Sequence, residues 1–183
     1  AAAERNENIL FVCYDNEAYM NTGIQRSSAT PLAAWTTTTP ESSPKADRKK
    51  DIDRIMAAHR VPYCATTSVG YPEDLMRKFL KAKGIVGMRF IHILAPCPPG
   101  WKLASDMTVE IARMAVESNV FPLYEVVVGI RYHMTYHPKR PICVEQYLKV
   151  QGRFRHLTPE MVTQFATEVR ERWDRLQNDC TSS

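Results

Sequence analysis

The 183-residue sequence has no run of about 18 apolar residues and no hydrophobic signal segment at its start, so it predicts neither a membrane span nor secretion. It also lacks a Cys-x-x-Cys pair. Its five cysteines are dispersed, which argues against a disulfide framework and favours reduced thiols in a cytoplasmic protein. The charge excess is small, with 24 basic and 20 acidic residues, and gives no indication of nucleic-acid binding. With 44% hydrophobic residues, the chain is expected to form a globular domain.

Strand and helix patterns alternate over residues 1–140. Apolar runs near 9–14, 63–69, 89–94 and 122–130 indicate strands, and amphipathic patterns between them indicate helices. This order predicts an α/β fold with a doubly wound, mostly parallel sheet. The first run is continuously apolar, which favours a strand covered on both faces. Because the residues before it read as the end of a helix, we expect that an N-terminal portion of the domain is missing from the sequence.

Residues 141–183 have a different pattern, and we expect a docking segment followed by a C-terminal helix. Thr158-Pro159-Glu160 is typical of a helix N-terminus, and apolar residues then recur at helical spacing as far as Leu176. The chain is therefore divided into an α/β domain and a helical tail.

Two loops that directly follow predicted strands carry residues suited to chemistry. The first is Asp15–Gly23, which begins a long polar connection that we expect to be an ordered site loop. The second is Ala95–Trp101, which holds Cys97 between prolines. Ligands of open α/β sheets bind beyond the carboxyl ends of the strands, so we expect both loops at one edge of the sheet.

The residues of these loops allow two interpretations each. Asp15, Asn16 and Glu17 are oxygen ligands of the kind that Mg²⁺ prefers, but they also suit an ordinary turn rich in Asp and Asn. Prolines have no N–H and a fixed φ, so they hold the Cys97 sulfur in a set direction. That thiol is either a ligand of a site completed from elsewhere or an inert, half-buried side chain.

The segment DNEAYMNTGIQRSSATP, residues 15–31, resembles the thiamine diphosphate loop in the beta subunit of the pyruvate:ferredoxin oxidoreductase family. Residues 95–101 and 147–157 resemble later segments of the same subunit. The resemblance implies a thiamine diphosphate-binding fold without its N-terminal portion. It also implies conversion of pyruvate, CoA and oxidised ferredoxin into acetyl-CoA, CO₂ and reduced ferredoxin, reversibly, through a thiamine diphosphate enamine and a 4Fe–4S cluster.

The same resemblance assigns roles to single residues. Asn16 would bind Mg²⁺ through its side-chain oxygen and Ala18 through its backbone carbonyl, and the ion would bridge to the diphosphate. Asn21 would be the catalytic residue, placed beside the reactive carbon, where an N–H donor stabilises a developing oxyanion. The cofactor-binding residues implied are Asp15, Asn16, Ala18, Asn21, Thr22 and Gly23.

Cys97 matches the family's remote fourth thiolate of the 4Fe–4S cluster. In this family the other three thiolates come from an upstream segment. Coenzyme A is the implied cosubstrate. The implied partners are alpha, gamma and delta subunits and ferredoxin.

Two features of the family are missing from the sequence. There is no Gly-Asp-Gly motif, whose aspartate is a further Mg²⁺ ligand, and no cysteine precedes Cys13. We therefore expect the isolated chain to be inactive. Three alternatives stay open: the same chemistry on another 2-oxoacid such as oxalate, an aryl glyoxylate or 2-oxoglutarate; a thiamine enzyme without redox chemistry; and a non-catalytic scaffold paralogue.

A basic group near the tail has no assigned role. Lys149, Arg153, Arg155 and His156 could meet the phosphates of coenzyme A, an acidic ferredoxin or a neighbouring subunit, or form a solvated face.

Overall fold

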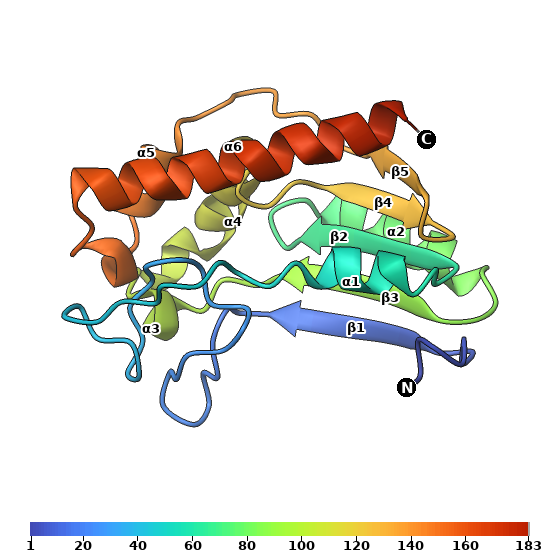
Figure 1. Cartoon of the computed structure of the whole chain (residues 1–183), viewed down its shortest axis with the longest axis horizontal. Coiled ribbons are helices and arrows are strands. Elements are labelled where there is room, and N and C mark those ends of the chain that lie inside the picture. The colour runs from blue at the N-terminus through green and yellow to red at the C-terminus, as the bar shows by residue number, and fades with distance from the viewer. Residues whose placement is uncertain (183) are drawn as a thin grey trace.

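The computed structural model describes residues 1–182 and contains a five-stranded sheet with the order β1-β3-β2-β4-β5 (Figure 1). Three strands are parallel and end level with one another, since Asp15, Leu94 and Ser68 are in register. The next strand, β4, pairs antiparallel with β2 and forms an antiparallel hairpin with β5. The strand bounds are β1 Leu10–Asp15, β2 Tyr63–Ser68, β3 Arg89–Leu94, β4 Tyr124–Val127 and β5 Arg131–Met134.

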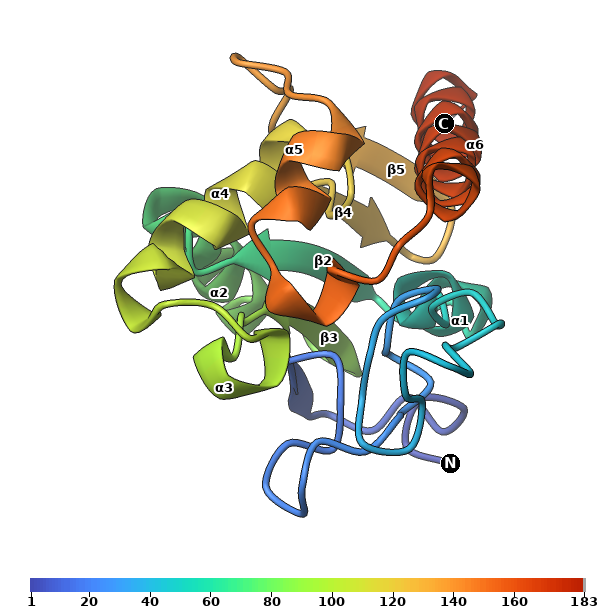
Figure 2. The same ribbon diagram turned by 90° about the vertical axis from the view of Figure 1, so that its left-hand side faces the viewer.

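Helices cover both faces of the sheet, which confirms the α/β doubly wound prediction. Figure 2 shows α1 and α6 on one side, and α2 and α4 on the other. The helix bounds are α1 Ile52–Ala58, α2 Pro72–Lys83, α3 Pro98–Trp101, α4 Thr108–Glu117, α5 Val144–Lys149 and α6 Pro159–Thr181, with 3₁₀ turns η1 Ser105–Met107 and η2 Gly152–Phe154. Within residues 1–182 no helix combines the length and apolar character needed to cross a bilayer.

The core is divided by the sheet because successive side chains of a strand point to opposite faces. Tyr63 and Ala65 of β2 pack with α2 on one face, whereas Cys64 packs with Met56 of α1 and Leu176 of α6 on the other. A third cluster joins α4, α5 and the first half of α6 to the loops beyond the carboxyl ends of the strands. The helical tail therefore packs directly on the loop region.

Within residues 1–182 the first strand does not have the burial predicted for it. β1 is an edge strand of this sheet, and Phe11 and Tyr14 are 52% and 68% exposed. The continuous apolar run predicted the strand itself correctly. Within residues 1–182, however, no strand pairs with its outer edge, and little covers its faces.

Candidate functional site

The two loops singled out in the sequence leave the sheet side by side. The first loop leaves β1 after Asp15, and the second leaves the neighbouring strand β3 after Leu94 (Figure 2). The amide of Ala95 donates a 2.9 Å hydrogen bond to the carbonyl oxygen of Asp15. Further out, the indole Nε1 of Trp101 donates to the carbonyl oxygen of Asn16 at 2.8 Å. The predicted convergence at one edge of the sheet is confirmed.

The side chain of Met20 in the first loop packs closely against Gly100 in the second. A Cβ atom built there would overlap the side chain of Met20 and lie 3.6 Å from the Sγ of Cys97. A side chain at this position would therefore displace the end of the Met20 side chain from the second loop. Met20 and the half-buried Cys97 both pack against the same hydrophobic cluster. The Cys97 sulfur thus lies on the side of its loop that faces the first loop.

The acids of the first loop are engaged within the protein. The Nζ of Lys49 lies 2.6 Å from Asp15 Oδ2 and 2.7 Å from Glu17 Oε1, and both carboxylates are buried. The other Asp15 oxygen accepts from the Glu17 amide at 2.8 Å. Glu17 has a φ of +69°, a conformation that non-glycine residues seldom adopt and that these bonds hold in place. The carboxylates therefore shape the loop.

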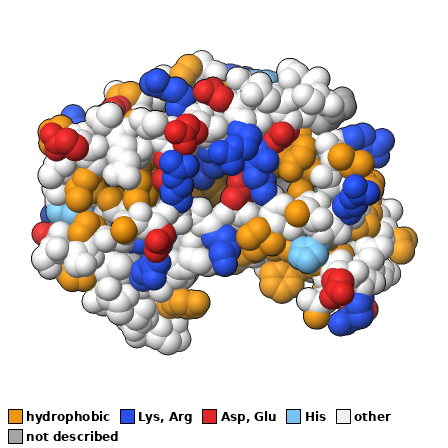
Figure 3. All heavy atoms as spheres, viewed as in Figure 1, with side chains coloured by type: hydrophobic (Ala, Val, Ile, Leu, Met, Phe, Trp, Pro, Cys, Tyr) orange, Lys and Arg blue, Asp and Glu red, His pale blue; other side chains and the backbone are white. Residues whose placement is uncertain are grey.

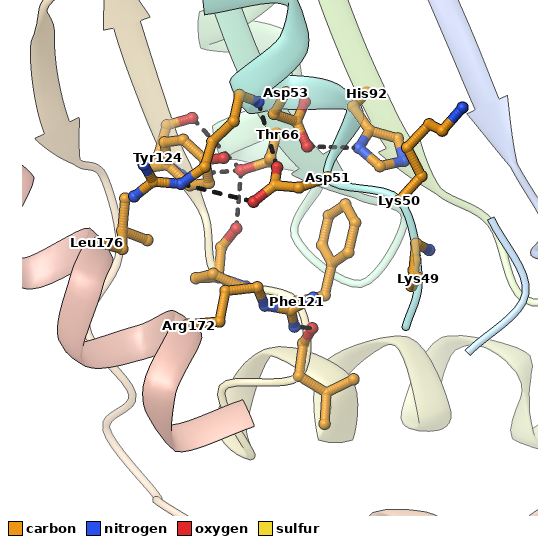
Figure 4. Close-up of a pocket in the computed structure, with 13 residues that line it drawn as sticks. Lys49, Lys50, Asp51, Asp53, Thr66, His92, Phe121, Tyr124, Arg172 and Leu176 are labelled. Atoms are coloured by element: carbon orange, nitrogen blue, oxygen red, sulfur yellow. Dashed lines mark hydrogen bonds and ion pairs between the residues drawn. The ribbon is translucent and has the colours of Figure 1, made fainter. Parts of the chain in front are cut away.

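His92 extends this network into the sheet. Its Nε2 lies 2.8 Å from Asp15 and its Nδ1 lies 2.7 Å from Asp53 at the start of α1, as the dashed line to Asp53 in Figure 4 shows. Burial opposes protonation of the ring, but the charge of Asp53 and the hydrogen bonds to both carboxylates outweigh it and raise the pKa of His92 to about 9. The ring is an imidazolium at neutral pH.

The charges of this network perturb one another. Burial by itself would raise the pKa of the Asp15 carboxyl, but Lys49 and His92 hold it well below its usual range. Burial would also lower the pKa of Lys49, and the two carboxylates raise it instead. All three groups are therefore charged at neutral pH, which a buried cluster tolerates only when its charges are paired.

The neutral residues of the first loop make fewer hydrogen bonds than its acids. Among residues 1–182, the one hydrogen bond that the side-chain oxygen of the half-buried Asn16 accepts is a long 3.5 Å contact from the Ala18 amide. Within the described residues, no hydrogen bond to the Ala18 carbonyl is found. Asn21 is exposed at the loop tip, where Thr22 and Gln25 bond each other. Amide and carbonyl oxygens of this kind fit the needs of a magnesium diphosphate.

Two neighbouring residues at the tip of the loop have positive φ angles. Gly23 has a φ of +115°, and Ile24 has a φ of +63°, which is rare for a β-branched residue. The Thr37 hydroxyl donates to the Gly23 carbonyl at 2.7 Å, and the Thr37 amide donates to that of Ile24 at 3.0 Å. The polar connection thus folds back on its own start, as expected of an ordered site loop.

A metal cluster at Cys97 would need ligands from outside the described residues. In residues 1–182 no three His, Cys, Asp or Glu side chains are grouped so that they could hold a metal ion. Cys13 and Cys64 lie within strands, and burial raises the pKa of both thiols. Cys97 is half-buried beside the first loop and could supply one thiolate.

The front face carries a second feature, a small cavity between α1, β4 and α6. Figure 3 shows basic side chains gathered in the middle of this face, and Figure 4 shows the cavity itself. Arg54 pairs with Asp179 and Asp51, and Arg172 donates to the Val120 carbonyl. These groups are thus engaged inside the protein. The residues that line the cavity include Lys49, Lys50, Arg54, His92, Phe121 and Arg172.

Sequence reasoning missed Lys49, His92 and Trp101. No sequence pattern marks Lys49 as a partner of Asp15, because the two residues are 34 positions apart and Lys49 lies in a polar segment. His92 could have been noticed as the one ionisable residue inside the apolar run of β3 after Arg89. Trp101 was placed correctly at the end of the second loop, but its hydrogen bond to the first loop was not predicted.

Comparison with known proteins identifies the class. A family model described as the C-terminal TPP-binding domain of thiamine pyrophosphate enzymes matches residues 1–93, about half of the chain. The chain belongs to this family, and the resemblance inferred from the first loop is confirmed.

Curated relatives are close in sequence but longer. The ketoisovalerate oxidoreductase subunit VorB of Pyrococcus abyssi is 50% identical over 179 residues, which cover 95% of this chain and 57% of the relative. The pyruvate synthase subunit PorB of Methanocaldococcus jannaschii is 51% identical over 174 residues, covering 93% and 58%. The chain therefore spans less than two thirds of these relatives.

A solved structure supports the fold. The 2-oxoglutarate:ferredoxin oxidoreductase from Magnetococcus marinus, with 2-oxoglutarate, coenzyme A and succinyl-CoA bound, is similar with a TM-score of 0.50. The similarity covers 61% of this chain and 45% of that one, at 21% identity. At this identity the match shows the fold alone.

Proposed function

We propose that this chain is part of the thiamine diphosphate-binding subunit of a CoA-dependent 2-oxoacid:ferredoxin oxidoreductase that acts on pyruvate. The observation that carries the proposal is the contact of the two loops, through Trp101 and the Asn16 carbonyl and through Met20 and Gly100 beside Cys97. An oxidoreductase of this kind needs an electron acceptor next to the thiamine. The second loop carries the free thiol of Cys97 beside the first loop, which is the proposed cofactor-binding loop.

Each residue of the first loop has a distinct task in this proposal. Asn16 and the Ala18 carbonyl would hold the Mg²⁺ of the cofactor, since neither oxygen accepts a short hydrogen bond from any of the described residues 1–182. Asn21 would donate its amide N–H to the oxygen of the 2-oxoacid carbonyl. Asp15, Thr22 and Gly23 would maintain the loop, with the Asp15 carboxylate acting through Lys49 and His92.

Bound thiamine diphosphate would supply the electron sink for decarboxylation, and a 4Fe–4S cluster at Cys97 would accept the electrons. The remaining thiolates, the further magnesium ligand and the ferredoxin-docking surface would come from the rest of the enzyme. Alpha, gamma and delta subunits are the partners that the resemblance suggests.

Ketoisovalerate is the second candidate substrate. It is favoured by the ketoisovalerate oxidoreductase subunit of Pyrococcus abyssi, which is 50% identical to this chain, while the pyruvate synthase subunit of Methanocaldococcus jannaschii is 51% identical. Comparing kcat/KM for pyruvate and ketoisovalerate in the assembled enzyme decides between them.

The test uses the complete enzyme with variants of this chain. Asn21→Ala should lower kcat for 2-oxoacid oxidation by roughly 100-fold, the size of effect found when an oxyanion donor is removed. Asn16→Ala should instead raise the Mg²⁺ and thiamine diphosphate concentrations required for activity. Asn178→Ala, on the exposed face of α6, is the matched control and should change neither.

Cys97→Ala tests the redox part separately. Decarboxylation of the 2-oxoacid should survive while ferredoxin reduction is lost, and the iron content should fall. If ferredoxin reduction survives as well, the assignment of Cys97 is wrong. If the wild-type enzyme oxidises no 2-oxoacid when supplied with thiamine diphosphate, the whole proposal is wrong.

A further inference from the structure

Arg153 occupies a position that the sequence pattern did not suggest. It was expected in a basic surface group with Lys149 and Arg155, which are indeed exposed. Arg153 itself is only 2% exposed and lies in η2, between α5 and α6. A buried guanidinium is costly unless its charge and its donors are satisfied, so its surroundings show what it does there.

The Arg153 side chain contacts both site loops at once. Its Nη2 lies 2.6 Å from Glu17 Oε2 in the first loop, and its guanidinium carbon lies 3.8 Å from the centre of the Trp101 ring at the end of the second. The same Trp101 donates to the Asn16 carbonyl. A salt bridge to one loop and a cation–π contact with the other thus share one planar group.

The backbone around Arg153 reinforces this arrangement. The Trp35 amide donates to the Arg153 carbonyl at 3.0 Å, and the Gly152 amide donates to the Lys102 carbonyl, also at 3.0 Å. Gly152 has no space for a side chain, since a Cβ there would lie 2.6 Å from the Lys102 Cβ. Segment 151–154 is therefore fitted between the continuation of the first loop and the end of the second.

The guanidinium has little freedom to move. Its Nε donates to Gln151 Oε1 at 2.9 Å, and the Gln151 amide nitrogen donates to the Tyr147 carbonyl at 2.7 Å. Gln151 and Tyr147 are themselves fully buried. The position of Arg153 is thus fixed from α5, an element that belongs to neither loop.

We propose that Arg153 is a positioning residue that sets the spacing between the loop of Asn16 and Asn21 and the segment of Cys97. This inference rests on the proposed function, because the spacing matters only if the chemistry passes between those loops. The tail of the chain, which supplies none of the candidate ligands, would then control how well the two halves of the site are aligned. Misplacement by about 1 Å costs up to roughly 100-fold in rate in enzymes generally.

The experiment compares three variants in the assembled enzyme. Arg153→Lys keeps a charge for Glu17 but loses the planar stack on Trp101, whereas Arg153→Met keeps an unbranched side chain and loses the charge. Arg155→Lys, two residues away and exposed, is the matched control. The measurements are kcat and KM for pyruvate with viologen as electron acceptor, and hydrogen exchange of the amides of residues 97–103.

We expect both Arg153 variants to lower kcat by roughly tenfold or more, with KM for pyruvate within about twofold of wild type. Amide exchange over residues 97–103 should become faster in both variants and stay unchanged in the control. If Arg153→Met does not assemble, Arg153→Lys decides the question alone.

Two outcomes would overturn the inference. One is that the kcat of Arg153→Lys equals that of the Arg155 control. The other is that kcat falls with no change in amide exchange over residues 97–103. The segment of Cys97 would then keep its position without the contact between Arg153 and Trp101. Failure of the proposed function is distinguishable, because in that case the wild-type enzyme itself would not oxidise pyruvate or ketoisovalerate.

Discussion

The protonated state of His92 should make the stability of this fold depend on pH in a predictable direction. His92 is held between Asp15 and Asp53, and its pKa rises from 6.5 to about 9 on folding. A difference of this size corresponds to about 3 kcal/mol at 1.36 kcal/mol per pH unit. Since domains of this kind are stable by only about 5–15 kcal/mol, the contribution is large.

The direction follows from which state binds the proton. Between pH 6.5 and about 9 the native chain holds a proton on His92 that the unfolded chain has lost. The stabilisation is therefore complete below pH 6.5 and disappears as the pH rises through 9. His92→Gln removes the titrating group and leaves three carboxylates with two cations, so it should be less stable than wild type at pH 6 and lose its disadvantage by pH 10.

Urea unfolding at pH 6, 7.5, 9 and 10 measures this difference. The free energy of unfolding of wild type, taken relative to His92→Gln, should fall by about 2 kcal/mol in total between pH 7 and pH 9, or about 1 kcal/mol per pH unit. Taking the difference cancels the titration of cysteines and tyrosines that both proteins share. Parallel pH profiles for the two proteins would refute the reasoning, because His92 would then be neutral in the native state.

Three further predictions concern the fold and its thiols. Gly129→Ala should destabilise the chain by more than about 1 kcal/mol in urea unfolding, since φ is +72° and the new Cβ would overlap a carbonyl of α1. Gly84→Ala should change stability little, because its new Cβ would only make an ordinary contact with the Lys81 carbonyl oxygen at 3.7 Å. Thr158→Ala should cost about 1 kcal/mol in the same assay, because the Thr158 hydroxyl caps α6. In the folded chain a thiol reagent, followed by mass spectrometry of the peptides, should label the exposed Cys143 first and the buried Cys64 only on unfolding.

The position of the site could be predicted from the sequence because it depends on local order. The strands before Asp15 and Ala95 are apolar runs, and their carboxyl ends must meet at one edge if they are parallel neighbours. Helix α6 was equally clear from its start at Thr158 and its regular apolar spacing. These features need no knowledge of which distant residues meet.

The charged network could not be predicted, because its members come from five separate parts of the chain. Lys49 is separated from Asp15 by 34 residues, and Arg153 from Glu17 by 136. In the sequence each looks like an ordinary surface charge, and only tertiary packing removes it from water. The exposure of β1 was missed for a related reason: an apolar run predicts a strand, but the neighbours of that strand decide whether its faces are covered.

The network also explains why the candidate ligands of a loop rich in acids are its neutral residues. Asp15, Glu17 and Asp53 carry three negative charges, and Lys49, His92 and Arg153 carry three positive ones. Carboxylates left unpaired at this edge would repel a diphosphate, and in a buried site the repulsion would be screened only weakly. Because their charge is balanced within the protein, the acids can hold the strained backbone at Glu17, and the oxygens of Asn16 and Ala18 stay available for the metal ion that we propose. An Asp15→Asn substitution should therefore disturb the loop through Lys49 and His92, which would each lose a charged partner, rather than by removing a magnesium ligand.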